Sequence, residues 1–281
     1  MGKDPDHAMD GSTPSPIGIF DSGVGGLSVL RAIRDRLPSH PVIYVADQVH
    51  VPYGAHTRDE VRAFSEGITR FLLGQGAELI VVACNTASAA ALYYLRETFP
   101  SIPFVGMEPA VKPAAASTRS GVIGVLATPV TFQGELYASV VERFGKDVTI
   151  FQDTCPGLVG QIEAGDLNGP ETRRILEAAL RPMLAQGVDT VVMGCTHYPF
   201  VIPLIQQIVG PGVQVIDPAP AIARQAGRLL ETRGGAIQKE PVGKATFYTT
   251  GNPHRLEKML PRLLGESQVV QYVKWESGLL G

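Results

Sequence analysis

The chain has 281 residues, of which 44% are hydrophobic and 18% are charged, and its formal net charge is −3. This length supports about two domains with sizeable buried cores. Because the charge is nearly balanced, no lysine or arginine run occurs, and no apolar stretch approaches the roughly 18 residues of a membrane span, the sequence predicts neither a nucleic-acid nor a membrane partner.

The first 16 residues, MGKDPDHAMDGSTPSP, are polar and lack the apolar core of a secretory signal. We expect residues 1–16 to form a disordered tail. The chain contains three cysteines, too few for a disulfide framework in a chain of this length. Reduced thiols and a cytoplasmic location are therefore expected.

From residue 17 onward, short apolar runs alternate with segments of helical periodicity. Runs with the composition of buried strands occur at 17–20, 41–46, 78–83, 103–106, 121–127, 148–151, 189–194, 213–217 and 245–250. Helical segments between them include 58–76, 86–99, 171–187 and 221–234. Strands without polar alternation are covered on both faces, so this order predicts parallel βαβ units in a doubly wound α/β fold.

Two similar segments indicate that the chain has two related halves. VVACNTASA surrounds Cys84 and VVMGCTHYP surrounds Cys195, each at the end of an expected strand. We predict two flavodoxin-like domains related by pseudo-symmetry, the first formed by 17–109 plus 219–281 and the second by 110–218. Ligands of such sheets bind beyond the carboxyl ends of the strands, so the active site is expected in the interdomain cleft.

The segment GIFDSGVGG places Asp21 and Ser22 at a strand end, before glycines that lead into a helix. We expect these glycines to supply positive φ angles and close packing. The spacing is not G-x-G-x-x-G, and Asp21 would repel a pyrophosphate, so a dinucleotide loop is disfavoured. Pro52-Tyr53-Gly54 form a turn near the same sheet edge; such turns are usually surface features, although their N–H groups can bind a carboxylate.

The two cysteine segments carry the strongest chemical signal. Asn85 follows Cys84 and Thr196 follows Cys195, and both are good helix N-cap residues. A helix N-terminus lowers a thiol pKa from about 8.5 and also binds anions. The alternatives are two small core residues, a disulfide, or a metal site shared with a nearby histidine, but the matched settings favour catalysis. Cys155 precedes a proline in no comparable setting, and we expect it only to pack.

Two activated thiols are suited to stereoinversion at a carbon acid, because one can remove the α-proton while the other delivers a proton to the opposite face. The seven lysines lie outside the strand-end motifs, so no Schiff-base lysine for pyridoxal phosphate is indicated and no cofactor is predicted. Asp21 is the candidate partner of Cys84. His197 and Glu163 are the candidate partners of Cys195.

These motifs resemble those of the glutamate racemases, cofactor-independent enzymes of bacterial cell-wall synthesis within the aspartate/glutamate racemase superfamily. The matching stretches span about residues 17–255 and are GIFDSGVGGLSVL, VPYG, VVACNTASA, GVLATPVT, LVGQIEAG, MGCTHYPF and FYTTGNP. The resemblance implies interconversion of L- and D-glutamate for peptidoglycan, two α/β domains with the substrate between them, and a homodimer.

By that resemblance, Cys84 handles the proton of D-glutamate with help from Asp21, and Cys195 handles that of L-glutamate with help from Glu163 and His197. No metal is implied. The implied substrate-binding residues are Asp21, Ser22, Pro52, Tyr53, Gly54, Asn85, Thr86, Thr128, Thr131, Thr196 and His197. The rivals are an aspartate racemase of the same superfamily and a non-catalytic ligand-binding or redox protein; only a racemase exchanges the Cα proton with solvent deuterium.

Overall fold

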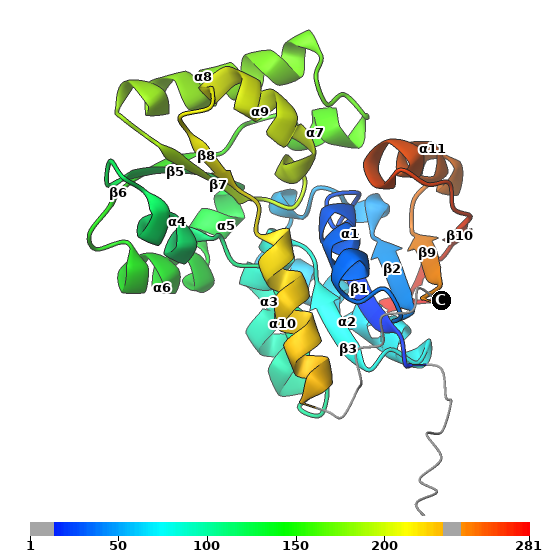
Figure 1. Ribbon diagram of the computed structural model, residues 1–281. Helices are drawn as coiled ribbons and strands as arrows, with labels where there is room; N and C mark the ends of the chain where they lie inside the picture. Colours follow the sequence, from blue (N-terminus) through cyan, green and yellow to red (C-terminus); the bar gives the residue numbers. More distant parts are fainter. Residues whose placement is uncertain (1–13, 233–242) are drawn as a thin grey trace, which may run out of the picture.

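The computed structural model describes residues 14–232 and 243–281, and its main feature is a pair of parallel β-sheets (Figure 1). The larger sheet has the strand order β10-β9-β2-β1-β3-β4, and the smaller one has the order β6-β5-β7-β8. Every neighbouring pair in both sheets is parallel. The predicted α/β class with two parallel sheets is thus confirmed, whereas residues 1–13 of the predicted tail lie outside the described residues.

The larger sheet is covered by helices on both faces. Its strands are β1 (Ile17–Asp21), β2 (Val42–Ala46), β3 (Leu79–Val82), β4 (Phe104–Gly106), β9 (Ala245–Thr249) and β10 (Val270–Tyr272). Its helices are α1 (Leu27–Arg36), α2 (Arg58–Gly74), α3 (Asn85–Thr98), α10 (Ala219–Glu231) and α11 (Pro253–Leu264). Ile19 packs in one buried cluster and the next residue, Phe20, packs in another. Successive side chains point to opposite faces, so two covered faces explain the continuous apolar run.

The smaller sheet is built in the same way. Its strands are β5 (Val122–Ala127), β6 (Thr149–Asp153), β7 (Thr190–Gly194) and β8 (Gln214–Ile216). The helices in this part of the chain are α4 (Val111–Ser117), α5 (Pro129–Gln133), α6 (Glu135–Phe144), α7 (Leu158–Glu163), α8 (Pro170–Ala185) and α9 (Ile202–Val209). After β8 the chain returns to the larger sheet, because α10 packs against α1. The domain boundaries near residues 109 and 218 stay a prediction.

The C-terminal segment contains strands that the sequence did not predict. β10 pairs in parallel with β9, and β11 (Trp275–Glu276) pairs antiparallel with β12 (Leu279–Leu280). The hairpin packs against α2, where the Trp275 ring lies over Gly67. Strands of two or three residues are too short to show a period, so only their tertiary contacts identify them. Within the described residues, no helix is long and apolar enough to cross a membrane.

The parallel topology gathers the strand ends that matter for chemistry. β1 ends at Asp21 and β3 ends two residues before Cys84. In the other sheet, β7 ends directly before Cys195. Three short 3₁₀ helices, Gln48–His50, Tyr53–Ala55 and Tyr198–Val201, follow β2 and β7 at these same ends. Both sheets therefore present their carboxyl ends to one region, as expected for a ligand site in an open α/β sheet.

Candidate active site

A cavity of about 450 Å³ lies at these strand ends and receives both candidate thiols. Cys84 reaches it from the larger sheet and Cys195 from the smaller one. Each thiol-bearing residue is only 5% exposed. The other residues that line the cavity are Ser22, Val51, Pro52, Tyr53, Gly54, Ala55, Asn85, Thr86, Thr128, Pro129, Thr154, Cys155, Pro156, Gly157, Val159, Gly160, Glu163, Thr196, His197 and Tyr198.

Cys84 is itself the N-cap residue of α3, and its sulfur accepts the Ala87 N–H at 3.5 Å. The prediction that Asn85 caps this helix was wrong by one residue. The expected fall in the thiol pKa is also wrong for Cys84. Burial first, and then the Asp21 carboxylate, raise the pKa of Cys84 well above its usual value and outweigh the Ala87 hydrogen bond. Cys84 is therefore a protonated thiol at neutral pH.

Asp21 lies behind the cavity wall and is fully buried. One carboxylate oxygen accepts the Ser22 N–H at 2.8 Å, and the other accepts the Gly26 N–H at 2.6 Å and the Thr196 hydroxyl at 3.4 Å. Burial raises the pKa of Asp21, although the charge of His197 and an interaction with the Cys84 thiol partly oppose this rise. Asp21 interacts with the Cys84 thiol, and its predicted direct contact with substrate is not supported by its place outside the cavity lining.

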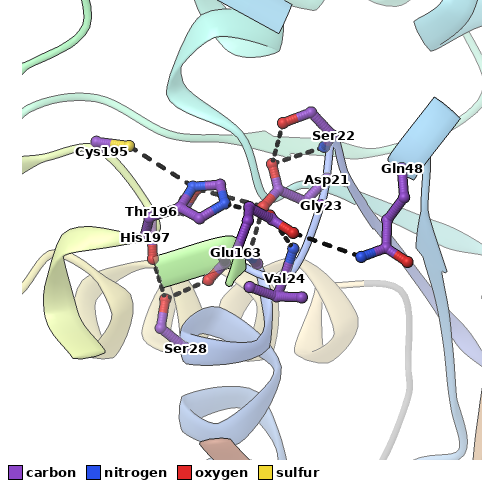
Figure 2. A network of polar contacts seen from close by, with 12 residues as sticks. Asp21, Ser22, Gly23, Val24, Ser28, Gln48, Glu163, Cys195, Thr196 and His197 are labelled. Atoms are coloured by element: carbon purple, nitrogen blue, oxygen red, sulfur yellow. Dashed lines mark hydrogen bonds and ion pairs between the residues drawn. The ribbon is translucent and has the colours of Figure 1, made fainter. Parts of the chain in front are cut away.

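Cys195 has a different environment, shown in Figure 2. Its sulfur lies 3.8 Å from Nδ1 of His197, whose Nε2 lies 2.6 Å from Oε1 of Glu163. Burial by itself lowers the pKa of His197, but its contacts with Cys195 and Glu163 outweigh burial and raise it well above the usual value. The imidazolium then donates from both nitrogens. Thr196 does not cap a helix here, since a turn separates Cys195 from the 3₁₀ helix that begins at Tyr198.

Glu163, the last residue of α7, also contacts the first part of the chain. Its Oε1 accepts the Val24 N–H at 2.8 Å, and its Oε2 lies 3.4 Å from Nε2 of Gln48. Burial raises the pKa of Glu163, but the hydrogen bond and charge of His197, helped by Val24 and Gln48, give a net lowering. The carboxylate therefore stays charged beside the imidazolium, and the predicted proximity of Glu163 to Cys195 is realised through His197.

The glycines after Asp21 are required for close packing and not for positive φ angles. None of Gly23, Gly25 and Gly26 has a positive φ angle. A Cβ at Gly23 would lie 1.9 Å from Oε1 of Glu163, and a Cβ at Gly25 would lie 2.5 Å from Nδ1 of His197. Gly23 and Gly25 thus make room for side chains from the second half of the chain, whereas Gly26 lies against Asp21, Tyr44 and Ala83. The predicted close packing is confirmed, and the predicted positive φ angles are wrong.

The predicted substrate-binding residues fall into two groups. Ser22, Pro52, Tyr53, Gly54, Asn85, Thr86, Thr128, Thr196 and His197 line the cavity, whereas Asp21 and Thr131 do not. Thr131 instead contacts the Thr128 hydroxyl at 2.9 Å, and Thr128 contacts the Thr86 hydroxyl at 3.0 Å. This row of hydroxyls connects α3 with α5 beside the cavity.

Asn85 is unusual because both of its side-chain polar atoms are buried without a hydrogen-bond partner among the residues that the structure describes. Leaving a buried amide unsatisfied is costly, so such a group in a cavity indicates a site for a polar ligand. Asn85 is also the first residue of α3, where the backbone N–H groups of Asn85 and Thr86 have no acceptor within the helix and can bind an anion. The amide and the helix end thus provide donors for a carboxylate.

Sequence reasoning missed the wall that follows β6. Cys155, Pro156 and Gly157 line the cavity, and Cys155 is 2% exposed with a φ of 44°. Since β6 was predicted to end at residue 151, the rule that ligands bind beyond strand ends would have identified this loop. Burial raises the pKa of the Cys155 thiol, and the Asp153 charge adds to this rise. That Cys155 only packs stays a prediction. Among the described residues, no group of three or more His, Cys, Asp or Glu side chains is placed to hold a metal ion.

Comparison with known proteins identifies close relatives. The family model described as Asp/Glu/Hydantoin racemase matches residues 27–226. A glutamate racemase of Pseudomonas paraeruginosa is 50% identical over 256 residues, which cover 91% of this chain and 96% of the relative. A glutamate racemase structure from Bacillus anthracis has a TM-score of 0.82 at 31% identity and covers 95% of this chain and 100% of its own. The Escherichia coli glutamate racemase, solved with L-glutamate and the activator UDP-MurNAc-ala, has a TM-score of 0.81 at 32% identity. The match covers 93% of this chain and 98% of the Escherichia coli chain.

Proposed function

The chain belongs to the Asp/Glu/Hydantoin racemase family, and we propose that it interconverts L-glutamate and D-glutamate by proton transfer at Cα between two cysteines, supplying D-glutamate for peptidoglycan. The observation that carries this proposal is the pair of buried thiols, Cys84 and Cys195, which reach one cavity from two different sheets. Each has its own ionisable partner, so each can exchange a proton independently of the other.

Reaction of L-glutamate begins when the Cys195 thiolate takes the α-proton. The C–H bond breaks, its electron pair remains on Cα, and Cys84 then gives its thiol proton to the opposite face to form the new C–H bond. The imidazolium of His197 places positive charge beside the Cys195 sulfur, and the high pKa of Cys84 keeps that thiol ready to donate. Reaction of D-glutamate is the reverse, and it starts from the enzyme form that the forward reaction leaves, in which Cys195 carries the proton and Cys84 is the thiolate.

The difficult part of this reaction is the carbanion, which forms next to a carboxylate. Donors aimed at the carboxylate oxygens stabilise the developing charge, and they act more strongly in a buried site than in water. Several groups of the cavity wall can do so: the backbone N–H groups of Asn85 and Thr86 at the start of α3, the Asn85 side-chain amide, and the Thr86 and Thr128 hydroxyls. These cavity-lining residues therefore bind and orient the substrate in our proposal.

The test is incubation of the purified protein with D-glutamate in D2O, without pyridoxal phosphate, while optical rotation and α-deuterium are followed. We expect inversion with one deuterium gained at Cα. Cys84→Ala and Cys195→Ala should each abolish inversion, because each leaves one face without a proton carrier. Faster exchange with aspartate would assign the aspartate specificity instead, and no exchange with either amino acid would indicate a binding or redox protein.

Two further features belong to the same proposal. We infer a homodimer from the family resemblance, and light scattering of the purified protein tests it. We infer a cytoplasmic location from the three free thiols, because reduced cysteines persist there. Cell fractionation tests that location.

A further inference from the structure

Gln48 connects the larger sheet to the partner groups of Cys195, although it does not line the main cavity. It is the first residue of the 3₁₀ helix after β2. Its Nε2 lies 3.4 Å from Oε2 of Glu163, and its Oε1 accepts the Thr249 hydroxyl at 2.9 Å. Figure 2 shows the amide nitrogen of Gln48 facing the Glu163 carboxylate. No role was predicted for this residue.

The amide of Gln48 can point in only one direction. The Thr249 oxygen already accepts the Gly251 N–H at 3.0 Å, so its own proton is free to be donated to Gln48. Thr249 is fully buried at the end of β9. The Glu163 carboxylate can only accept hydrogen bonds, so the donor end of the amide must face it, and the acceptor end then faces the Thr249 hydroxyl.

The two oxygens of Glu163 have separate tasks. Oε1 holds His197 at 2.6 Å and the Val24 N–H at 2.8 Å. Within residues 14–232 and 243–281, Oε2 accepts a hydrogen bond from Gln48 alone. A carboxylate held at one oxygen only is free to turn about its Cγ–Cδ bond. Holding Oε2 thus fixes the direction in which Oε1 faces the imidazole.

We propose that Gln48 is a positioning residue for one half of the reaction: by holding Glu163 against His197, it supports proton transfer at Cys195 and leaves proton transfer at Cys84 unaffected. This inference rests on the proposed racemase function. The asymmetry follows from the contacts, because Asp21, the partner of Cys84, is held by Ser22, Gly26 and Thr196 and not by Gln48.

The first test compares α-deuterated L- and D-glutamate in the wild type and in Gln48→Met, which keeps the side-chain length but removes the donor. Since the enantiomers have equal free energy, kcat/KM must fall equally in both directions, by roughly 3- to 10-fold for one lost hydrogen bond. The isotope effects must diverge. With L-glutamate, Cys195 removes the deuteron; this step becomes more rate-limiting, so the isotope effect rises. With D-glutamate, Cys84 removes the deuteron and the slowed step at Cys195 comes afterwards, so the isotope effect falls.

The controls separate this role from general damage. Thr249→Val removes the hydroxyl that orients the amide and should shift both isotope effects in the same directions as Gln48→Met, but less. Gln271→Met changes an exposed glutamine on β10 and should change neither. Isotope effects that are unchanged, or that rise together or fall together, would overturn the proposal.

A second readout does not need turnover. The proton on Nε2 of His197, bonded to Glu163 at 2.6 Å, should give a downfield NMR signal that moves upfield in Gln48→Met. An unchanged signal would overturn the inference, because Glu163 would then be held without Gln48. If the wild type racemises no amino acid, the proposed function fails, and the NMR signal still decides whether Gln48 holds Glu163.

Discussion

Gly23→Ala tests whether the first half of the chain must leave room for Glu163. Gly23 has no positive φ angle, so alanine adds no backbone strain there. Its Cβ would, however, lie 1.9 Å from Oε1 of Glu163. Since non-bonded carbon contacts are optimal near 3.5 Å, the carboxylate would have to retreat by roughly 1.5 Å. That displacement breaks the 2.6 Å contact with His197 and the 2.8 Å contact with Val24.

The size of the effect follows from those contacts. A hydrogen bond to a charged group contributes about 1.5–3 kcal/mol, which corresponds to a roughly 10- to 150-fold loss of kcat/KM. The assay is glutamate racemisation followed by circular dichroism, with a urea unfolding curve to verify that the variant is folded. Gly74→Ala is the matched control, because a Cβ at that end of α2 meets no atom within 4 Å. Wild-type kcat/KM in Gly23→Ala would refute the reasoning, since the Glu163–His197 contact would then be dispensable.

Three other predictions concern binding, the third thiol and pH. Asn85→Ala should raise KM for glutamate by roughly 10-fold without lowering the free energy of unfolding, because the amide has no protein partner to lose; an unchanged KM would show that substrate does not use it. Cys155→Ala should keep kcat within a factor of about two and cost roughly 1 kcal/mol of stability in urea unfolding, as a buried group removed from a cavity wall; a large loss of kcat would give Cys155 a part in the reaction. The stability difference between wild type and His197→Gln, measured by urea unfolding across pH, should be greatest between the ordinary values of 4.5 for a glutamate and 6.5 for a histidine. The raised pKa of His197 means that its contribution is complete below 6.5 and is lost as pH rises through the folded-state pKa. The lowered pKa of Glu163 means that its contribution is complete above 4.5 and is lost as pH falls through the folded-state pKa. A stability difference that keeps growing above pH 6.5 would contradict the sign for His197, and one that keeps growing below pH 4.5 would contradict the sign for Glu163.

The fold class was predictable because its signals are local. The apolar runs predicted at 17–20 and 78–83 became β1 and β3, and the periodic segment 58–76 became α2. Side-chain periodicity is a property of a few neighbouring residues, so it survives without knowledge of the rest of the chain. The two-residue strands β11 and β12 lack that information, and their place is set by contact with α2.

The sequence by itself determined that two thiols stand at strand ends, because a buried strand followed by polar capping residues can be recognised within ten positions. Only the tertiary structure decided how those thiols differ. Burial beside the Asp21 carboxylate reverses the pKa shift expected of a helix N-terminus at Cys84, whereas Cys195 meets the imidazole of His197. Gly23 and the amide of Gln48 both lie against Glu163, which is more than a hundred residues away in the sequence. Desolvation and charge depend on what lies within a few ångströms in space, and neighbours in sequence do not specify that.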